Sequence, residues 1–138
     1  MLSYFYLMII STAAVILNGN NVLLAKRKPG GTLGGKWEFP GGKTKPEETP
    51  EQTLKRELLE ELGISIEIKE YIGTVNFQNK NKDYKLLAYL CSHKDGEILN
   101  LEHAEVSWFN INEVKTKDLA DSDKSILPKI IKYLENNL

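Results

Sequence analysis

One stretch of the sequence, GGKTKPEETPEQTLKRELLEELGI at residues 41–64, restricts the fold more than any other. A helix is marked at its start by Thr49 as N-cap, Pro50 at the first helical position and Gln52 in a capping box. Gly63 is placed to end this helix. Leucines recur every four residues between these ends and predict one buried helix face: Leu54, Leu58 and Leu62.

Strands are predicted on both sides of this helix in the sequence. An apolar run over residues 1–17, a turn signal at 18–21 and a second apolar run at 22–25 predict a hairpin. Met8 is an equally good start for the first strand, which would leave residues 1–7 as a loose or sheet-edge extension. The further elements expected are a short strand at 37–39, a strand at 64–68, a hairpin with arms 71–77 and 84–91 and tip 79–82, and a strand at 106–109.

The chain is expected to finish with an amphipathic helix that has Pro128 near its start, where backbone donors lack partners anyway. The buried face of this helix is predicted to carry Ile126, Ile130, Ile131 and Leu134. Helices and strands mix without a strict βαβ rhythm, and no repeat or linker divides the 138 residues. The sequence therefore predicts a single domain over residues 1–138, of the α/β (α+β) class, as a layered α/β/α sandwich with a mixed sheet.

Charge and cysteine content limit the partners and the compartment. Eighteen Lys and Arg residues against nineteen Asp and Glu give a net charge of -1, so nothing in the overall charge attracts nucleic acid or an anionic membrane. The uncharged N-terminal run lacks the basic start of a secretory signal and falls short of the roughly twenty apolar residues of a membrane-spanning helix. Cys91 is the one cysteine and has no disulfide partner in the chain, which favours the reducing cytoplasm.

Three glutamates crowd one side of the predicted helix. At about 100° per residue, Glu57, Glu60 and Glu61 fall within roughly a third of its circumference, at the edge of the leucine face. A solvated acidic face would account for this pattern. Carboxylates at the border of a core also suit a cation, and all-oxygen ligands favour Mg²⁺, for which Mn²⁺ can substitute. Magnesium sites usually include phosphate oxygens, and four basic residues near the glycine turns could meet further phosphate charge: Arg27, Lys28, Lys36 and Lys43.

The residues in and before this helix follow a longer pattern with fixed spacing. It consists of Gly42, five residues, Glu48, seven residues, Arg56-Glu57-Leu58, one residue, Glu60-Glu61, one residue, and Gly63-Ile64. This pattern resembles the complete Nudix box, and WEFPGGK at residues 37–43 resembles the MutT-like branch of that family. The resemblance implies an α/β/α Nudix fold with a mixed, twisted sheet, and Mg²⁺-dependent hydrolysis of a nucleoside diphosphate linked to another group.

The resemblance also implies roles for single residues of the box. Glu48 would support the site, and Arg56 would orient Glu57 and offset the crowded negative charge. The metal ligands that it implies are Glu57, Glu60, Glu61 and the Gly41 carbonyl.

A further acidic residue is implied downstream of the box. MutT-like proteins can use an acid six residues before a tryptophan as a metal ligand or as the base, and Glu102 stands six residues before Trp108. Glu105 is a nearer alternative, and either could instead be a solvated loop acid. We expect Glu57 to be the base that takes the proton of the attacking water, with Glu102 as the second candidate.

Substrate contacts are expected from residues outside the box. The resemblance implies that Asp123, just before the C-terminal helix, reads the base, although Asp121, Ser122 or Asp123 could equally act as a helix N-cap. Glu38 and Phe39 could line the base pocket, and Phe39 could equally be ordinary core. Two basic residues are expected to hold phosphate oxygens: Arg27 and Lys43.

The substrate implied by the MutT-like branch is a nucleoside triphosphate, including oxidised purines such as 8-oxo-dGTP, which is cleaved to the monophosphate and pyrophosphate. Two alternatives stay open: a Nudix hydrolase of a dinucleoside polyphosphate or nucleotide sugar, and a non-catalytic nucleotide-binding module. The proline-bearing ADP-ribose signature is absent downstream of the box, which counts against ADP-ribose. A nucleotide is the expected partner, with no direct nucleic-acid or membrane binding, and the chain could be a monomer or a homodimer.

Overall fold

The structure, a computed structural model, describes residues 8–137. Its elements follow the chain in this order: β1 (Ile9–Asn18), β2 (Asn21–Lys26), β3 (Trp37–Glu38), α1 (Pro50–Leu62), β4 (Ser65–Asn79), β5 (Lys82–Asp95), β6 (Glu105–Asn110), α2 (Ile111–Val114) and α3 (Asp121–Asn137). The proposed extension at residues 1–7 lies outside the described residues. Among the described residues, no helix is long and apolar enough to cross a membrane.

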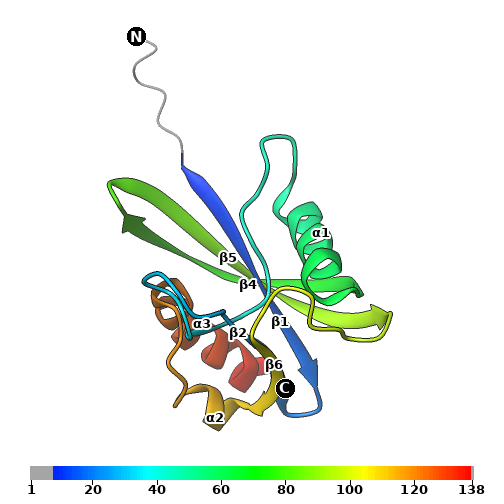
Figure 1. The fold of residues 1–138 in the computed structure, drawn as a ribbon. Coiled ribbons are helices and arrows are strands. Elements are labelled where there is room, and N and C mark those ends of the chain that lie inside the picture. Colours follow the sequence, from blue (N-terminus) through cyan, green and yellow to red (C-terminus); the bar gives the residue numbers. More distant parts are fainter. Residues whose placement is uncertain (1–7, 138) are drawn as a thin grey trace.

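Strand β1 lies at the centre of a mixed, twisted sheet (Figure 1). It pairs in parallel with β5, from Ile9 opposite Tyr84 to Ile16 opposite Cys91, and β5 pairs antiparallel with β4. The end of β1 forms a hairpin with β2, which also pairs antiparallel with β3 and β6. The predicted mixed sheet is confirmed.

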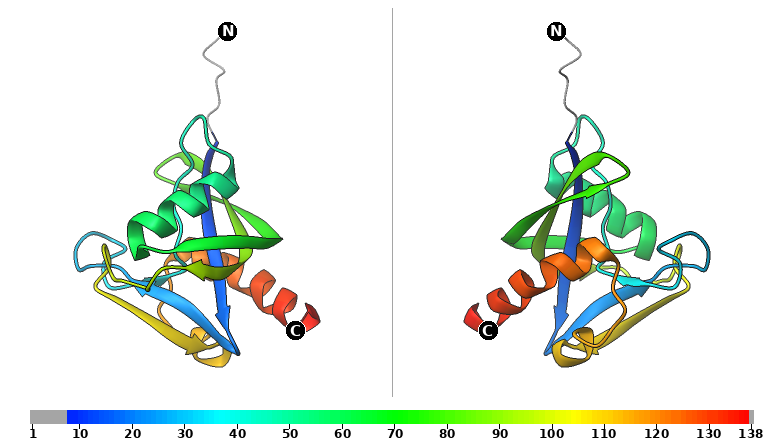
Figure 2. Two further views of the ribbon diagram at one scale, coloured as in Figure 1. Left: turned by 90° about the vertical axis from the view of Figure 1, so that its right-hand side faces the viewer. Right: turned by 90° about the vertical axis from the view of Figure 1, so that its left-hand side faces the viewer.

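The two faces of β1 contribute to two different cores, because successive side chains of a strand point to opposite faces. Ala13 and Val15 pack in the apolar cluster that contains the buried side of α3. Ala14 and Ile16 pack in the cluster that contains the leucines of α1. All four side chains are at most 1% exposed. Helices α1 and α3 therefore cover opposite faces of the sheet, as Figure 2 shows, and the predicted α/β/α sandwich is confirmed.

Helix α1 begins and ends where its local sequence predicts. The Thr49 hydroxyl accepts from the Gln52 backbone N–H at 3.1 Å, and the Gln52 side chain accepts from the Thr49 backbone N–H at 2.9 Å. Gly63 has φ of 69°, a left-handed conformation that glycine adopts without steric cost. These caps fix which side of α1 faces the sheet.

We expect replacement of Leu58 by Ala to destabilise the protein strongly, because Leu58 is fully buried under α1. Loss of a buried leucine side chain typically lowers the free energy of unfolding by about 2 to 5 kcal/mol. Leu59→Ala is the matched control, since Leu59 is 57% exposed and the expected change is within about 0.5 kcal/mol. Urea denaturation followed by circular dichroism measures both variants, and equal midpoints for the two would contradict the assigned face of α1.

One detail of the strand prediction was wrong. The strand expected at 64–68 and the hairpin arm expected at 71–77 form one continuous strand, β4. Its pairing with β5 shifts register between Ile68 and Glu70 and between Tyr71 and Gly73. Each shift leaves one residue unpaired and reverses which face of the sheet the following side chains point to. The alternation of apolar and polar residues is therefore interrupted although the strand continues.

The helical predictions after β6 were also incomplete. Pro128 lies inside α3 rather than near its start, because the helix already begins at Asp121 and the Ala120 carbonyl accepts from the Lys124 N–H at 2.8 Å. Burial of Ile126, Leu127 and Ile130 on both sides of the proline holds the helix together there. The short helix α2 was not predicted, since four residues are too few to show a helical period.

Candidate active site

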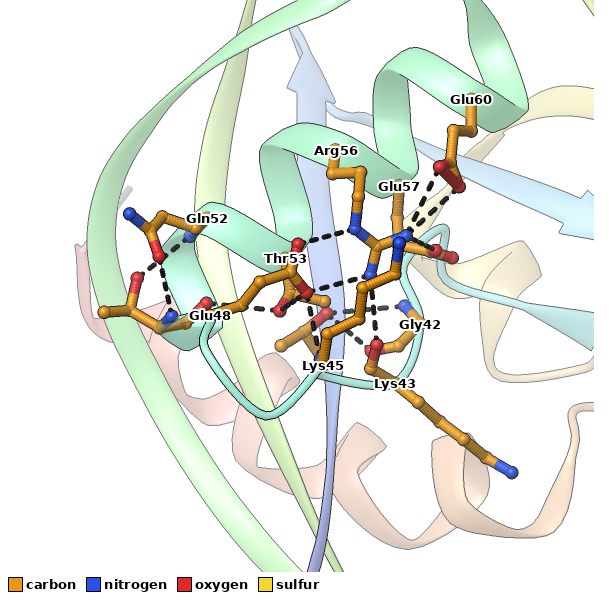
Figure 3. Close-up of polar contacts among 11 residues, drawn as sticks. Gly42, Lys43, Lys45, Glu48, Gln52, Thr53, Arg56, Glu57 and Glu60 are labelled. Atoms are coloured by element: carbon orange, nitrogen blue, oxygen red, sulfur yellow. Dashed lines mark hydrogen bonds and ion pairs between the residues drawn. The ribbon is translucent and has the colours of Figure 1, made fainter.

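Arg56, in the middle of α1, joins this helix to the loop before it (Figure 3). Its Nε donates to Glu48 Oε2 at 2.6 Å, and its NH1 donates to Glu57 Oε1 at 2.6 Å and to Glu60 Oε1 at 3.1 Å. Its NH2 donates to the Lys43 carbonyl at 3.2 Å. The hydrogen bond from Arg56 lowers the pKa of Glu48 to about 2, and the same contacts raise the pKa of Arg56 above its usual value. One planar guanidinium thus holds three carboxylates and a loop carbonyl.

The turn at Gly41 and Gly42 is held against both β1 and α1. The Gly42 carbonyl accepts from the Thr12 backbone N–H at 2.9 Å and from the Thr12 hydroxyl at 3.0 Å. A Cβ at Gly42 would overlap the Glu57 carboxylate, and a Cβ at Gly41, where φ is 152°, would overlap the Thr12 carbonyl. The absence of side chains at both positions therefore allows backbone and carboxylate to approach closely.

The three glutamates of α1 have different surroundings. Glu61 is only 3% exposed, and its Oε1 has no hydrogen-bond partner among the described residues. Burial, followed by the nearby Glu57, raises the pKa of Glu61 to about 10. Glu57 is largely buried, whereas the Glu60 side chain is 48% exposed and turned toward Arg56. Within residues 8–137, no three His, Cys, Asp or Glu side chains lie together in a way that could hold a metal ion.

A cavity of about 350 Å³ opens beside Glu57 and Glu61. The predicted residues that it brings together are Arg27, Lys28, Glu38, Gly41, Glu57, Glu61 and Glu102, and the remaining lining residues are Gly30, Gly42 and His103. Glu60 does not line it. Glu105 lies outside it on β6, where its carboxylate accepts from the Ser107 hydroxyl at 2.8 Å. The geometry thus favours Glu102 over Glu105 as the additional acid.

His103 is a residue of this cavity that the sequence reasoning missed. Its Nε2 lies 2.9 Å from Glu38 Oε2 and 3.9 Å from Glu61 Oε1, and its side chain is only 7% exposed. Arg27 NH1 donates to the other oxygen of Glu38 at 3.1 Å. No spacing in the sequence relates His103 to β3 or α1, and its one local signal is that it directly follows Glu102.

A second cavity, of about 270 Å³, adjoins the first and is more apolar. Its walls include five large apolar or aromatic side chains, from Leu33, Phe39, Phe77, Tyr84 and Leu86, together with Lys43 and Asp123. Phe77 and Tyr84 stack on each other with ring centroids 4.9 Å apart, and Lys43 Nζ lies 5.7 Å from the Tyr84 ring centre. Lys43 therefore borders the aromatic cavity and not the acidic one, whereas Arg27 borders both.

Asp123 is buried in the wall of the aromatic cavity. Its Oδ2 accepts from the Phe39 backbone N–H at 2.7 Å, across 84 positions of sequence. It is not the helix N-cap, because α3 already begins at Asp121. Burial raises the pKa of Asp123 to about 7. Phe39 is 3% exposed and belongs both to the core and to the cavity wall.

The buried Asp123 predicts a pH-dependent stability. Burial raises the pKa of Asp123 to about 7 in the folded protein, whereas it is near 3.8 in the unfolded chain. Ionisation of Asp123 therefore opposes folding as the pH rises between these two values. We expect the wild type to lose stability relative to Asp123→Asn across this window by at most about 1.4 kcal/mol per pH unit, and the difference to level off above it. Denaturant titrations at several pH values test this, and a pH-independent difference would contradict it.

Comparisons with known proteins show the family to which the chain belongs. The model of the NUDIX domain family matches residues 8–130. The chain is 34% identical over 120 residues to the CTP pyrophosphohydrolase of Escherichia coli K12, covering 87% of this chain and 89% of the relative. It is 40% identical over 79 residues to the 8-oxo-dGTP diphosphatase of Proteus vulgaris, covering 57% of this chain and 70% of the relative.

The fold is also similar to the folds of solved structures. The MutT protein from Methanosarcina mazei Go1 superimposes with a TM-score of 0.79 at 28% identity, covering 97% of this chain and 99% of that chain. Together with the matched family model, these similarities confirm the resemblance of the Nudix box and of the residues before it. The chain belongs to the NUDIX domain family, in its MutT-like branch, and is a hydrolase acting on acid anhydrides.

Proposed function

We propose that the protein hydrolyses nucleoside triphosphates to the monophosphate and pyrophosphate, with Mg²⁺ as its metal and Mn²⁺ as a substitute. The observation that carries this proposal is the pair of adjoining cavities, one acidic and one aromatic, with a shared wall. A nucleotide has the same division, since its phosphates need cations and its base offers a flat apolar surface for stacking.

The acidic cavity suits a divalent cation because Glu61 is buried without a partner for one of its oxygens. A buried carboxylate without a partner is costly, and a cation would remove that cost. The proposed ligands are Glu57, Glu60, Glu61, Glu102 and the Gly41 carbonyl, of which Glu60 is the outermost in this structure. A bound magnesium ion would neutralise phosphate charge and acidify water.

The protein's own side chains supply the remaining functions. Glu57 is proposed as the base that accepts the proton of the attacking water, because its carboxylate lines the cavity and Arg56 fixes it at 2.6 Å. Glu48 supports the site by holding Arg56 in turn. Arg27 and Lys28 line the same cavity and would bind phosphate oxygens there, while Lys43 would act from the aromatic side.

The base would occupy the aromatic cavity, between the rings of Phe77 and Tyr84 and the wall formed by Phe39. Asp123 has a pKa of about 7, so that near neutral pH its carboxyl group can donate or accept a hydrogen bond to a base edge. We propose cytosine and oxidised guanine as the first candidate bases, and the names of two relatives, for CTP and for 8-oxo-dGTP, support this choice. The biological role proposed is removal of damaged or surplus nucleotides from the cytoplasmic pool, by a monomer or a homodimer, with no direct contact to nucleic acid.

Metal binding should be visible without turnover. We expect Mg²⁺ or Mn²⁺ to raise the melting temperature, since a ligand at 100 times its Kd adds about 2.7 kcal/mol to the stability of the folded state. Glu61→Gln should lose most of this shift, while Glu67→Gln, on an exposed part of β4, should keep it. Differential scanning fluorimetry with and without the metal measures this, and an equal shift in both variants would place the metal elsewhere.

The reaction itself is tested with a substrate panel. The purified protein is incubated with Mg²⁺ and CTP, dCTP, dGTP, 8-oxo-dGTP, ADP-ribose, a nucleotide sugar and a dinucleoside polyphosphate, and the phosphate products are identified. Pyrophosphate and monophosphate from one or more triphosphates are the expected products. Release of orthophosphate alone, or turnover restricted to ADP-ribose, the nucleotide sugar or the dinucleoside polyphosphate, would overturn the proposal, and binding without any turnover would favour a non-catalytic module.

A further inference from the structure

The acidic and aromatic cavities share one wall, made of Arg27, Glu38, Gly41 and Gly42. Since the two glycines have no side chains, Arg27 and Glu38 supply the side-chain polar groups of this wall. In a nucleotide the sugar connects the phosphates to the base. If the proposed function holds, a substrate with its phosphates in one cavity and its base in the other has its sugar beside Glu38.

Glu38 is held firmly at this place. Its backbone pairs with Ala25 of β2, and each carboxylate oxygen has its own donor, Arg27 NH1 at 3.1 Å and His103 Nε2 at 2.9 Å. The side chain is 17% exposed, so it is largely buried yet still reaches both cavities. A carboxylate oxygen can accept more than one hydrogen bond, and Glu38 therefore keeps acceptor capacity for a ligand.

We propose that Glu38 accepts a hydrogen bond from a ribose hydroxyl of the bound nucleotide, and that His103 is a positioning residue that holds Glu38 for this contact. The protein then selects its substrates at the sugar as well as at the base. A site built to pair with a hydroxyl discriminates against an analogue that lacks it, because the buried polar group is left without its partner. Ribose offers a 2′ and a 3′ hydroxyl, 2′-deoxyribose only the 3′, and 2′,3′-dideoxyribose neither.

The test compares three substrates that differ only in these hydroxyls: CTP, dCTP and ddCTP, with the corresponding guanine set in parallel. Wild-type kcat/KM should be higher with a hydroxyl-bearing nucleotide than with the dideoxy form. The hydroxyl preference is the ratio of kcat/KM for the hydroxyl-bearing nucleotide to kcat/KM for the dideoxy form. Glu38→Met should reduce this ratio by about tenfold or more, the range expected for a hydrogen bond to a charged group. A decrease in wild-type kcat/KM from CTP to dCTP identifies the 2′ hydroxyl as the group that Glu38 binds. A decrease from dCTP to ddCTP identifies the 3′ hydroxyl.

Calorimetric titration with CMP, dCMP and ddCMP gives the same comparison for binding, without hydrolysis. If Glu38→Met does not fold, as judged by circular dichroism, Glu38→Leu takes its place, since Leu likewise has no group that accepts a hydrogen bond. A wild type that treats the three sugars alike, or a folded variant with an unchanged ratio, overturns the proposal. Absence of triphosphate cleavage would instead refute the proposed function, and the monophosphate titration would still decide the sugar contact.

His103 is tested by two amides that differ in reach. The amide nitrogen of Gln can occupy a position close to that of His Nε2, whereas that of Asn reaches only as far as Nδ1. His103→Gln should therefore retain the hydroxyl preference, and His103→Asn should lose it in the same way as Glu38→Met. If His103→Gln and His103→Asn both fold, have equal melting temperatures and show the same hydroxyl preference, His103 does not position Glu38.

Discussion

Replacement of Glu57 by Gln is expected to lower kcat by about 10³-fold, within the range that a positioned general base contributes. The Glu57 carboxylate lines the acidic cavity, accepts from Arg56 at 2.6 Å and lies where a Cβ on Gly42 would touch it. The amide of Gln fills the same space but neither accepts the proton of the attacking water nor supplies the negative charge that a cation needs. Steady-state kinetics with the best triphosphate of the panel measures the loss.

Two further variants make this prediction specific. Glu51→Gln changes an exposed acid in the first turn of the same helix, and we expect its kcat to stay within about twofold of wild type, as for a surface substitution remote from the site. Glu102→Gln tests the second candidate base, which lines the same cavity. A smaller loss for Glu57→Gln than for Glu102→Gln would assign the base to Glu102.

Replacement of Arg56 by Lys should also be severe, although it preserves the charge. The planar guanidinium binds Glu48, Glu57 and the Lys43 carbonyl at the same time, and an ammonium group cannot reproduce that geometry. We expect kcat to fall by about 10²-fold, the effect typical of displacing a reacting group by about 1 Å. Lys55→Arg, at the neighbouring exposed position, is the control and should leave kcat unchanged.

Arg56→Lys has a second, independent readout in the acid stability. The pKa of Glu48 is about 2 in the folded protein and near 4.5 without its partners, so its contribution is complete above about pH 4.5 and is lost as the pH falls toward 2. The variant should lose less stability than wild type across this window. Parallel acid-denaturation profiles of the two proteins would contradict the assigned role of the Arg56 to Glu48 contact.

The predictions from sequence succeeded where neighbouring residues determine the outcome. The helix signals act within a few positions of the chain; they are the capping residues Thr49 and Gln52 and the terminal Gly63. The bounds of α1 and the side on which its glutamates lie could therefore be predicted. The fixed spacing from Gly42 to Ile64 identified the family for the same reason.

What could not be predicted depends on residues that are distant in sequence. The contact between Asp123 and the Phe39 backbone and the contact between His103 and Glu38 form only after β3 is placed beside α3 and the 102–103 loop. Local patterns therefore suggested a helix cap for Asp123 and gave no role to His103. Local patterns failed in β4 for a different reason, because irregular pairing broke the alternation that marks a strand.

The central position of β1 has a consequence for synthesis of the chain. Its parallel partner is residues 84–91, so one edge of the strand stays unpaired until the ribosome has released more than half of the protein. Parallel pairing over such a separation is slow to form, and an unpaired apolar strand edge favours association with other chains. Nascent chains that stall before β5 should therefore be the species most dependent on chaperones, while release of β5 should allow the sheet to close.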